Sequence, residues 1–253
     1  ADDPDSDSED AVLDTSMDYL NDCTKVVYPY DMIEEAGFSA AAGIYPIDGE
    51  DYSTRDYYPG DESSGHGTHV SGIIGAAVND NGISGAAFGA SIMPVRVLYP
   101  FQNAAGSDIG GTGFTTDITD GIEWAVAGNA DVINMSLGAD GSMGEEDDYL
   151  FLTAVQDAVN AGVIVIVAAG NSSLDIDDAG AVPSSFSDTV AISSVSNTGS
   201  FASYSNYGDS IDVAAFGGEF NSNGNCTDST GVYSSYVNST LFNLSINIIY
   251  IFF

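Results

Sequence analysis

Short apolar runs alternate with segments of helical periodicity along this 253-residue chain, and that alternation most restricts the folds open to it. Strand-like runs occupy 92–98, 131–135, 163–167, 189–195 and 211–214. Helical spacing lies between them, at Ile118, Ile122, Ala125 and Val126, and at Phe151, Ala154, Val155, Ala158 and Val159. This pattern is typical of an α/β fold with a mainly parallel central sheet and helices on both faces.

Two of these segments carry further signals. The run 163–167 (VIVIV) is continuously apolar, which predicts a strand buried on both faces. The helix before it has four acidic residues at its start, 145–148, and Gly162 after its end, as the helix dipole and glycine caps favour.

Polar groups follow three apolar runs directly: Asp14, Ser136 and the turn Ala169-Gly170-Asn171. In open α/β sheets, ligands bind at the carboxyl ends of the strands. We therefore expect these three positions to lie at the functional edge of the sheet.

The charge balance is extreme, with 3 Lys and Arg against 38 Asp and Glu, a net charge of −35. Such a field repels nucleic acids and anionic membranes, so neither is expected as a partner. Two explanations stay open: a saline habitat, where salt screens the self-repulsion, or an ordinary acidic secreted protein.

No apolar stretch reaches the 18–20 residues of a membrane span, and no signal peptide is visible in the sequence, which opens with the acidic arm 1–10. Cys23 and Cys226 form no metal-binding spacing, and either one long-range disulfide or two separate thiols fit them.

Four motifs resemble those of the subtilisin-like serine proteases, the subtilases. They are Val12-Leu13-Asp14-Thr15, His66-Gly67-Thr68-His69-Val70, Asn134-Met135-Ser136-Leu137-Gly138 and Ala168-Ala169-Gly170-Asn171, and they occur in the family's order. The resemblance runs from 11 to 245 and implies a three-layer fold, secretion, and a monomer acting on peptide or protein substrates.

The resemblance also implies a role for each motif. His66 is the general base, Asp14 fixes its tautomer, and the Asn171 amide donates to the oxyanion. Ser136, Leu137 and Gly138 would hold an extended peptide by main-chain hydrogen bonds, next to Ala169 and Gly170. Catalysis by such groups needs no cofactor.

Simpler roles remain for some of these residues. Asp14 lacks the glycine that the family has two residues later, where Ser16 stands, and Asp48 is its rival. Asn171 could be a plain turn former, and Ser136 a strand-end hydroxyl. We assign His69, about one turn beyond His66, to the core.

A structural calcium site is a further expectation. The loop 78–83 (VNDNGI), including Asn79, lies where many subtilases bind Ca²⁺, and amide and main-chain oxygens suit that hard cation. Loops of this composition also occur without a metal.

The nucleophile motif of the family, Gly-Thr-Ser-Met, does not occur in the sequence. It is expected directly after Phe242-Asn243-Leu244-Ser245, but the chain continues with the apolar segment 246–253, and Ile248 occupies the serine's place. Without that serine we expect little or no hydrolysis. We expect a gene-model or frame error after Ser245, with a peptide-binding pseudoprotease as the alternative.

Overall fold

The computed structural model describes residues 25–33, 37–47, 52, 55–57, 59, 65–79, 82–219, 231–235 and 249–252. A seven-stranded sheet forms its centre, in the order β1-β2-β9-β5-β6-β7-β8. These strands are β1 (Tyr30–Asp31), β2 (Ile92–Arg96), β5 (Val132–Met135), β6 (Ile164–Ala168), β7 (Val190–Val195), β8 (Val213–Phe216) and β9 (Ile249–Phe252). All neighbouring pairs are parallel except the two that β9 makes.

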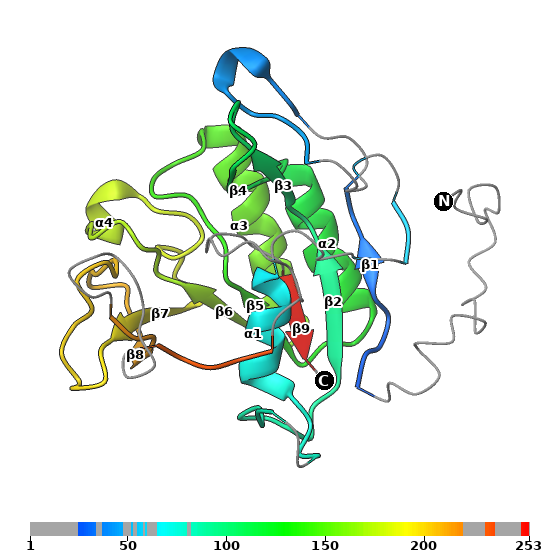
Figure 1. The fold of residues 1–253 in the computed structure, drawn as a ribbon, viewed down its shortest axis with the longest axis vertical. Helices are drawn as coiled ribbons and strands as arrows, with labels where there is room; N and C mark the ends of the chain where they lie inside the picture. The colour runs from blue at the N-terminus through cyan, green and yellow to red at the C-terminus, as the bar shows by residue number, and fades with distance from the viewer. Residues whose placement is uncertain are drawn as a thin grey trace.

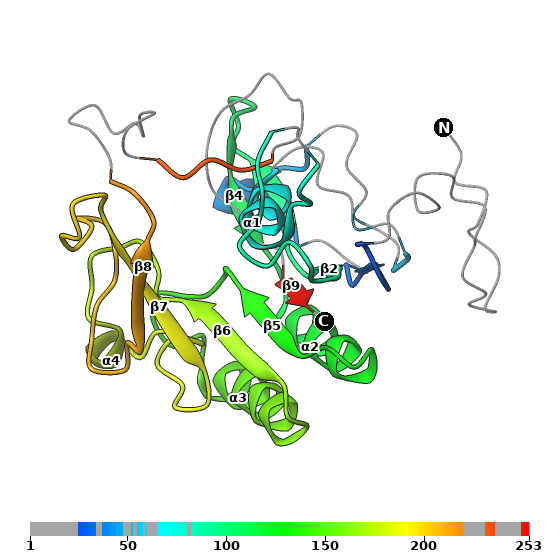
Figure 2. The ribbon, with the colours of Figure 1, turned by 90° about the horizontal axis from the view of Figure 1, so that it is seen from below.

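Helices lie on both faces of this sheet, as Figures 1 and 2 show. Helix α1 (His66–Gly75) covers one face, and α2 (Thr115–Ala127), α3 (Glu145–Asn160) and the short α4 (Ile176–Ala179) lie on the other. A separate antiparallel hairpin, β3 (Tyr99–Gln102) and β4 (Asp108–Thr112), and a 3-10 turn, η1 (Ala40–Ala42), complete the elements of the described residues. The three-layer α/β architecture predicted from the sequence is confirmed.

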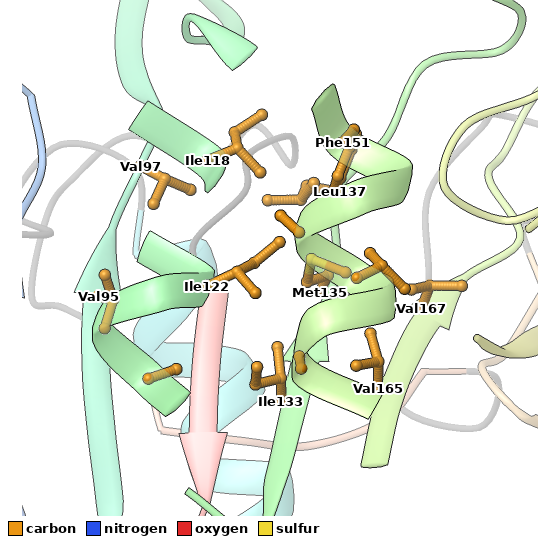
Figure 3. Close-up of a cluster of buried hydrophobic side chains, with 14 of the residues drawn as sticks. Val95, Val97, Ile118, Ile122, Ile133, Met135, Leu137, Phe151, Val165 and Val167 are labelled. Atoms are coloured by element: carbon orange, nitrogen blue, oxygen red, sulfur yellow. The ribbon is translucent and has the colours of Figure 1, made fainter. Parts of the chain in front are cut away.

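The main core lies between the sheet and the pair α2 and α3 (Figure 3). Ile122 of α2 faces Ile133 and Met135 of β5, which are fully buried, and Phe151 of α3 lies beside Leu137. Ile122 and Phe151 are each 1% exposed. The helical spacing noted in the sequence thus marks the buried stripe of each helix. On the other face, Val70 and Ile74 of α1 pack against Ile92 of β2.

Helix α3 starts where its charges favour it. Its first turn holds the four acidic residues 145–148, and the Asp148 carboxylate accepts a hydrogen bond from the Met143 amide at 2.9 Å. After the helix, Gly162 has a φ of 94°, a conformation that glycine adopts without strain. Both terminal signals predicted from the sequence are therefore confirmed.

The expectation that the run 163–167 is buried on both faces is wrong. Val165 and Val167 are each 1% exposed, but Ile164 is 53% exposed, so β6 alternates between an inner and an outer face. Helix α3 packs on β6 from one side and covers the face that carries the two valines. Strand β8 also begins two residues later than the predicted run 211–214.

Strand β9 is an element whose place in the sheet the sequence did not indicate. It pairs antiparallel with β2 on one side, Met93 opposite Ile251, and with β5 on the other, Ile133 opposite the same residue. The terminal apolar segment thus places residues 249–252 in the middle of the sheet, with α1 next to them.

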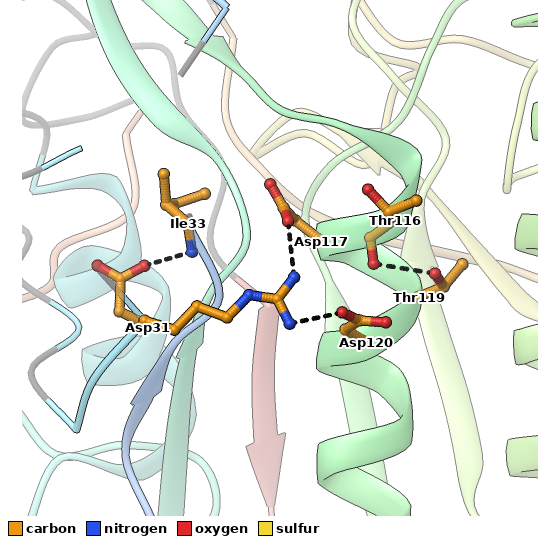
Figure 4. A network of polar contacts seen from close by, with 7 residues as sticks. Asp31, Ile33, Thr116, Asp117, Thr119 and Asp120 are labelled. Atoms are coloured by element: carbon orange, nitrogen blue, oxygen red, sulfur yellow. Dashed lines mark hydrogen bonds and ion pairs between the residues drawn. The ribbon is translucent and has the colours of Figure 1, made fainter. Parts of the chain in front are cut away.

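Ion pairs and hydrogen bonds connect Asp31 and Arg55, which precede α1 in the sequence, with the rest of the molecule (Figure 4). Arg55 forms ion pairs with Asp117 at 3.2 Å and Asp120 at 2.8 Å, both on the first half of α2. Asp31, at the end of β1, accepts from the Ile33 amide and pairs with Arg96 at 2.7 Å. Because Asp31 and Arg96 are both 3% exposed, this second pair is part of the interior.

Candidate active site

His66 is the first residue of α1, and the helix begins with Gly65 as its cap. Burial, with His69 as a second cause, lowers the pKa of His66 from 6.5 to about 4. The imidazole is therefore neutral at physiological pH, which is the form that accepts a proton. His69 is half-buried rather than a core residue, and its pKa is lowered by burial while a hydrogen bond to the Val232 main chain raises it.

The segment after β5 carries the predicted peptide-binding residues Ser136, Leu137 and Gly138. Leu137 is 5% exposed and anchors the segment, while Asn134 donates to the Ser136 hydroxyl at 3.0 Å. Main-chain groups of 136–138 make no hydrogen bond within the described part of the chain. An extended peptide could therefore pair with them.

The chain around Val182 packs against the segment 136–139 and holds it in place. Ala139 and Val182 exchange two main-chain hydrogen bonds, at 2.7 and 3.1 Å. A Cβ atom on Gly138 would lie 2.7 Å from the Val182 carbonyl oxygen, so only glycine fits this approach.

The turn Ala169-Gly170-Asn171 follows β6 directly. Strands β5 and β6 are parallel neighbours, with Met135 opposite Val167, so Ser136 and Ala169 begin at the same edge of the sheet. Gly170 has a φ of 101°, and the Asn171 side chain is exposed. An exposed amide at this edge can donate to an oxygen of a bound peptide.

Asn206 holds this turn and was not assigned a role from the sequence. Its side chain is fully buried and donates to the Ala169 carbonyl oxygen at 2.8 Å. Nothing in the sequence around it, 203–208 (SYSNYG), marks this asparagine as buried behind the turn.

Asp14 and its rival Asp48 lie outside the described residues, as do Cys23, Cys226 and Ile248. The predicted carboxylate partner of His66 therefore stays a prediction. The structure brings together the segments after β5 and β6 and places His66 on the face that α1 covers.

The predicted calcium loop is described in part. Asn79 is exposed, Asp80 and Asn81 fall outside the described residues, and the Gly85 amide donates to the Ala76 carbonyl oxygen at 2.9 Å to close the loop's base. No cluster of three or more His, Cys, Asp or Glu side chains suited to a metal occurs among the described residues. The Asn79 amide and nearby carbonyl oxygens are nevertheless donors of the kind that Ca²⁺ prefers.

Comparison with known proteins identifies the family of this chain. The sequence model of the Subtilase family matches residues 11–244. The chain belongs to the subtilase family. It is 33% identical over 250 residues to an extracellular protease of Xanthomonas campestris, and 35% identical over 190 residues to subtilisin E of Bacillus subtilis.

These alignments cover 89% and 74% of this subtilase, but 40% and 45% of the two relatives, so the chain spans less than half of their lengths. Among solved structures, a protease from Pseudoalteromonas arctica superposes with a TM-score of 0.61 at 31% identity, covering 84% of this chain and 67% of that one. In the described part of the subtilase, no helix is both long and apolar enough to cross a bilayer.

Proposed function

We propose that this subtilase is part of a secreted serine endopeptidase domain. The observation that carries the proposal is the joint position of residues 136–138 and 169–171 at one edge of the sheet, together with a neutral histidine opening α1. Family membership and the extracellular protease among the relatives support secretion and a peptide or protein substrate.

Each group has a distinct task in this proposal. The main chain of Ser136–Gly138 pairs with the substrate backbone and fixes the scissile carbonyl beside the turn after β6. Neutral His66 takes the proton of the attacking hydroxyl and later gives it to the leaving amine, while Asp14 stabilises the imidazolium. The Asn171 amide donates to the oxygen that becomes negative in the tetrahedral intermediate.

The sequence does not contain the attacking serine in its usual motif. This absence favours a second candidate function, in which the chain binds extended peptides without cleaving them. The recognition segment is the same in both cases, so the two functions differ only in the nucleophile.

Two measurements separate these functions. The nucleotide sequence downstream of the Ser245 codon should encode Gly-Thr-Ser-Met after a splice or frame change if the endopeptidase proposal is right. A confirmed stop after Phe253 contradicts it and favours the pseudoprotease.

At the protein level, the 253-residue chain should not react stoichiometrically with a fluorophosphonate, because it lacks the nucleophile motif. His66→Ala is the matched control. Stoichiometric labelling of the parent that this variant loses would reveal another active serine and contradict both candidates.

A structural calcium ion in the loop around Asn79 is a further part of the proposal. Bound calcium would order that loop and would take no part in catalysis. The melting temperature should therefore fall when EDTA replaces calcium, and Asn79→Ala should shrink the difference. A parent melting temperature that EDTA leaves unchanged contradicts the site.

A further inference from the structure

Asn206 makes four side-chain hydrogen bonds around the turn that carries Asn171. Its Nδ2 donates to the Ala169 carbonyl oxygen at 2.8 Å and to Asp140 Oδ1 at 3.2 Å. Its Oδ1 accepts from the amides of Ser172 at 2.8 Å and Leu174 at 3.2 Å. These contacts fix the main chain on both sides of Asn171 with one fully buried side chain.

Main-chain contacts restrict the same turn. The Asn206 amide donates to the Gly170 carbonyl oxygen at 3.0 Å, and the Tyr207 amide donates to the Leu174 carbonyl oxygen at the same distance. A Cβ atom on Gly170 would lie 2.3 Å from Asn206 Nδ2, so the asparagine fills the space behind the turn. The turn therefore has little freedom to shift relative to Asn206.

Asp140 extends these contacts to the other segment of the site. One carboxylate oxygen accepts from Asn206 Nδ2, and the other accepts from the Ser172 hydroxyl. Asp140 follows Gly138 by two residues, so it belongs to the same stretch of chain as the peptide-binding segment. The pair Asp140 and Asn206 thus connects the segment after β5 with the turn after β6.

We propose that Asn206, together with Asp140, is a positioning residue that holds the Asn171 amide where it can donate to an anionic oxygen of a bound peptide. The inference rests on the proposed oxyanion role of Asn171. Asn206 itself is buried behind the turn and acts through the main chain of 169–174. Donors of this kind must lie within about 0.5 Å of the productive position, so a small shift of the turn weakens the interaction.

A pair of peptides tests this inference on the whole 253-residue chain. The two have the same extended sequence, and one ends in a free carboxylate while the other ends in a carboxamide. The carboxylate stands for the anionic oxygen, and a charge-assisted hydrogen bond is roughly twice as strong as a neutral one. We expect the parent to bind the carboxylate peptide about tenfold more tightly by calorimetry, a difference of about 1.4 kcal/mol.

Variants then separate positioning from folding. Asn171→Ala and Asn206→Ala should both bring the ratio of the two dissociation constants close to one, while the affinity for the carboxamide peptide changes less than about twofold. Ser205→Ala is the matched control, because Ser205 is 1% exposed and its hydroxyl contacts Ser194 and the Asn206 carbonyl rather than the turn. It should lower the melting temperature and keep the parent's ratio.

Asp140 provides a second comparison in case Asn206→Ala does not fold. Asp140→Asn and Asp140→Ala remove the same charge, but the asparagine retains an oxygen that can accept from Asn206. The first should keep the preference for the carboxylate, and the second should reduce it.

The outcomes that contradict the inference are distinct. If Asn171→Ala removes the preference while folded Asn206→Ala and Asp140→Ala keep it, the positioning role is wrong and the oxyanion role stands. Equal ratios for the two Asp140 variants overturn the link through Asp140. A parent with no preference for the carboxylate overturns the oxyanion role and this inference with it.

Discussion

His66 shows how one residue links stability to pH. Burial lowers its pKa from 6.5 to about 4, so the folded chain holds the imidazole neutral where the unfolded chain takes up a proton. This contribution to stability is complete above pH 6.5 and is lost as the pH falls towards 4. His66→Gln should therefore remove up to about 3 kcal/mol of the pH dependence in that range.

Urea unfolding of both chains between pH 4 and 7 measures this difference. His69→Gln is the control, because His69 is only half-buried and its hydrogen bond to the Val232 main chain opposes the lowering of its pKa. Parallel pH profiles for the parent and His66→Gln would contradict the predicted effect of burial.

The Asp31–Arg96 pair has the opposite dependence on pH. Burial raises the pKa of Asp31 to about 6, although Arg96 at 2.7 Å lowers it. The contribution of the Asp31 carboxyl itself, as distinct from its pairing with Arg96, is therefore complete below about pH 4 and is lost as the pH rises through 6 and the buried carboxyl ionises. Arg96→Met leaves a buried carboxylate without its cation and should cost about 3 kcal/mol or more at pH 7.

At pH 4 the same substitution should cost less, because Asp31 is then protonated. Unfolding free energies at both pH values test this. Arg55→Met is the comparison, since Arg55 is 31% exposed at its side chain and its partner Asp120 is 41% exposed, so its loss should depend less on pH. A loss from Arg96→Met that is equal at both pH values would count against the buried pair.

At the scale of elements, β9 is a strand in which a single substitution should strongly lower the stability of the sheet, because it pairs on both edges. Ile251 lies opposite Met93 on one side and Ile133 on the other. A proline there removes an amide donor within a strand that has neighbours on both edges, and should cost about 1–3 kcal/mol for the hydrogen bond that is lost. Ile251→Val keeps the amide and should cost far less.

Hydrogen exchange locates the effect. In Ile251→Pro, amides of β2 and β5 should exchange faster, whereas those of β7 and β8 should change less. Uniform protection across the sheet in that variant would show that β9 does not hold the two neighbouring strands together.

Periodicity predicted some elements and could not predict others. Helices α2 and α3 were found because each buries a stripe at i, i+3 and i+4 against the sheet. The direction and partners of β9 were not predicted, since a four-residue apolar run does not encode which strands it joins. The hairpin β3–β4 was also missed, although Asn103, which accepts from the amides of Ala105 and Ser107, marks its turn.

The candidate site divides in the same way. His66, Ser136 and Asn171 were predicted because local motifs name them, and the parallel pairing of β5 and β6 was implied by the order of strands and helices. The role of Asn206 was not predicted, because a buried asparagine and a surface asparagine look alike in sequence. Its role depends on contacts with residues more than thirty positions away.

At the scale of the whole molecule, the net charge of −35 makes stability depend on salt. The Debye length falls from about 10 Å at 0.1 M to about 3 Å at 1 M, which weakens repulsion among surface carboxylates. The urea midpoint should therefore rise with sodium chloride over this range. A similar rise with an uncharged solute at equal osmolality, or no rise at all, would contradict an electrostatic origin.

The position of β9 also sets the order in which the sheet can be completed during synthesis. Strands β1 and β2 emerge from the ribosome early and β5 to β8 later, yet the two groups are joined through residues 249–252. Until those residues emerge, β2 and β5 each present an unpaired edge to the cell. A nascent chain that carries this segment therefore presents these two edges to chaperones, and to other nascent copies, until residues 249–252 have emerged.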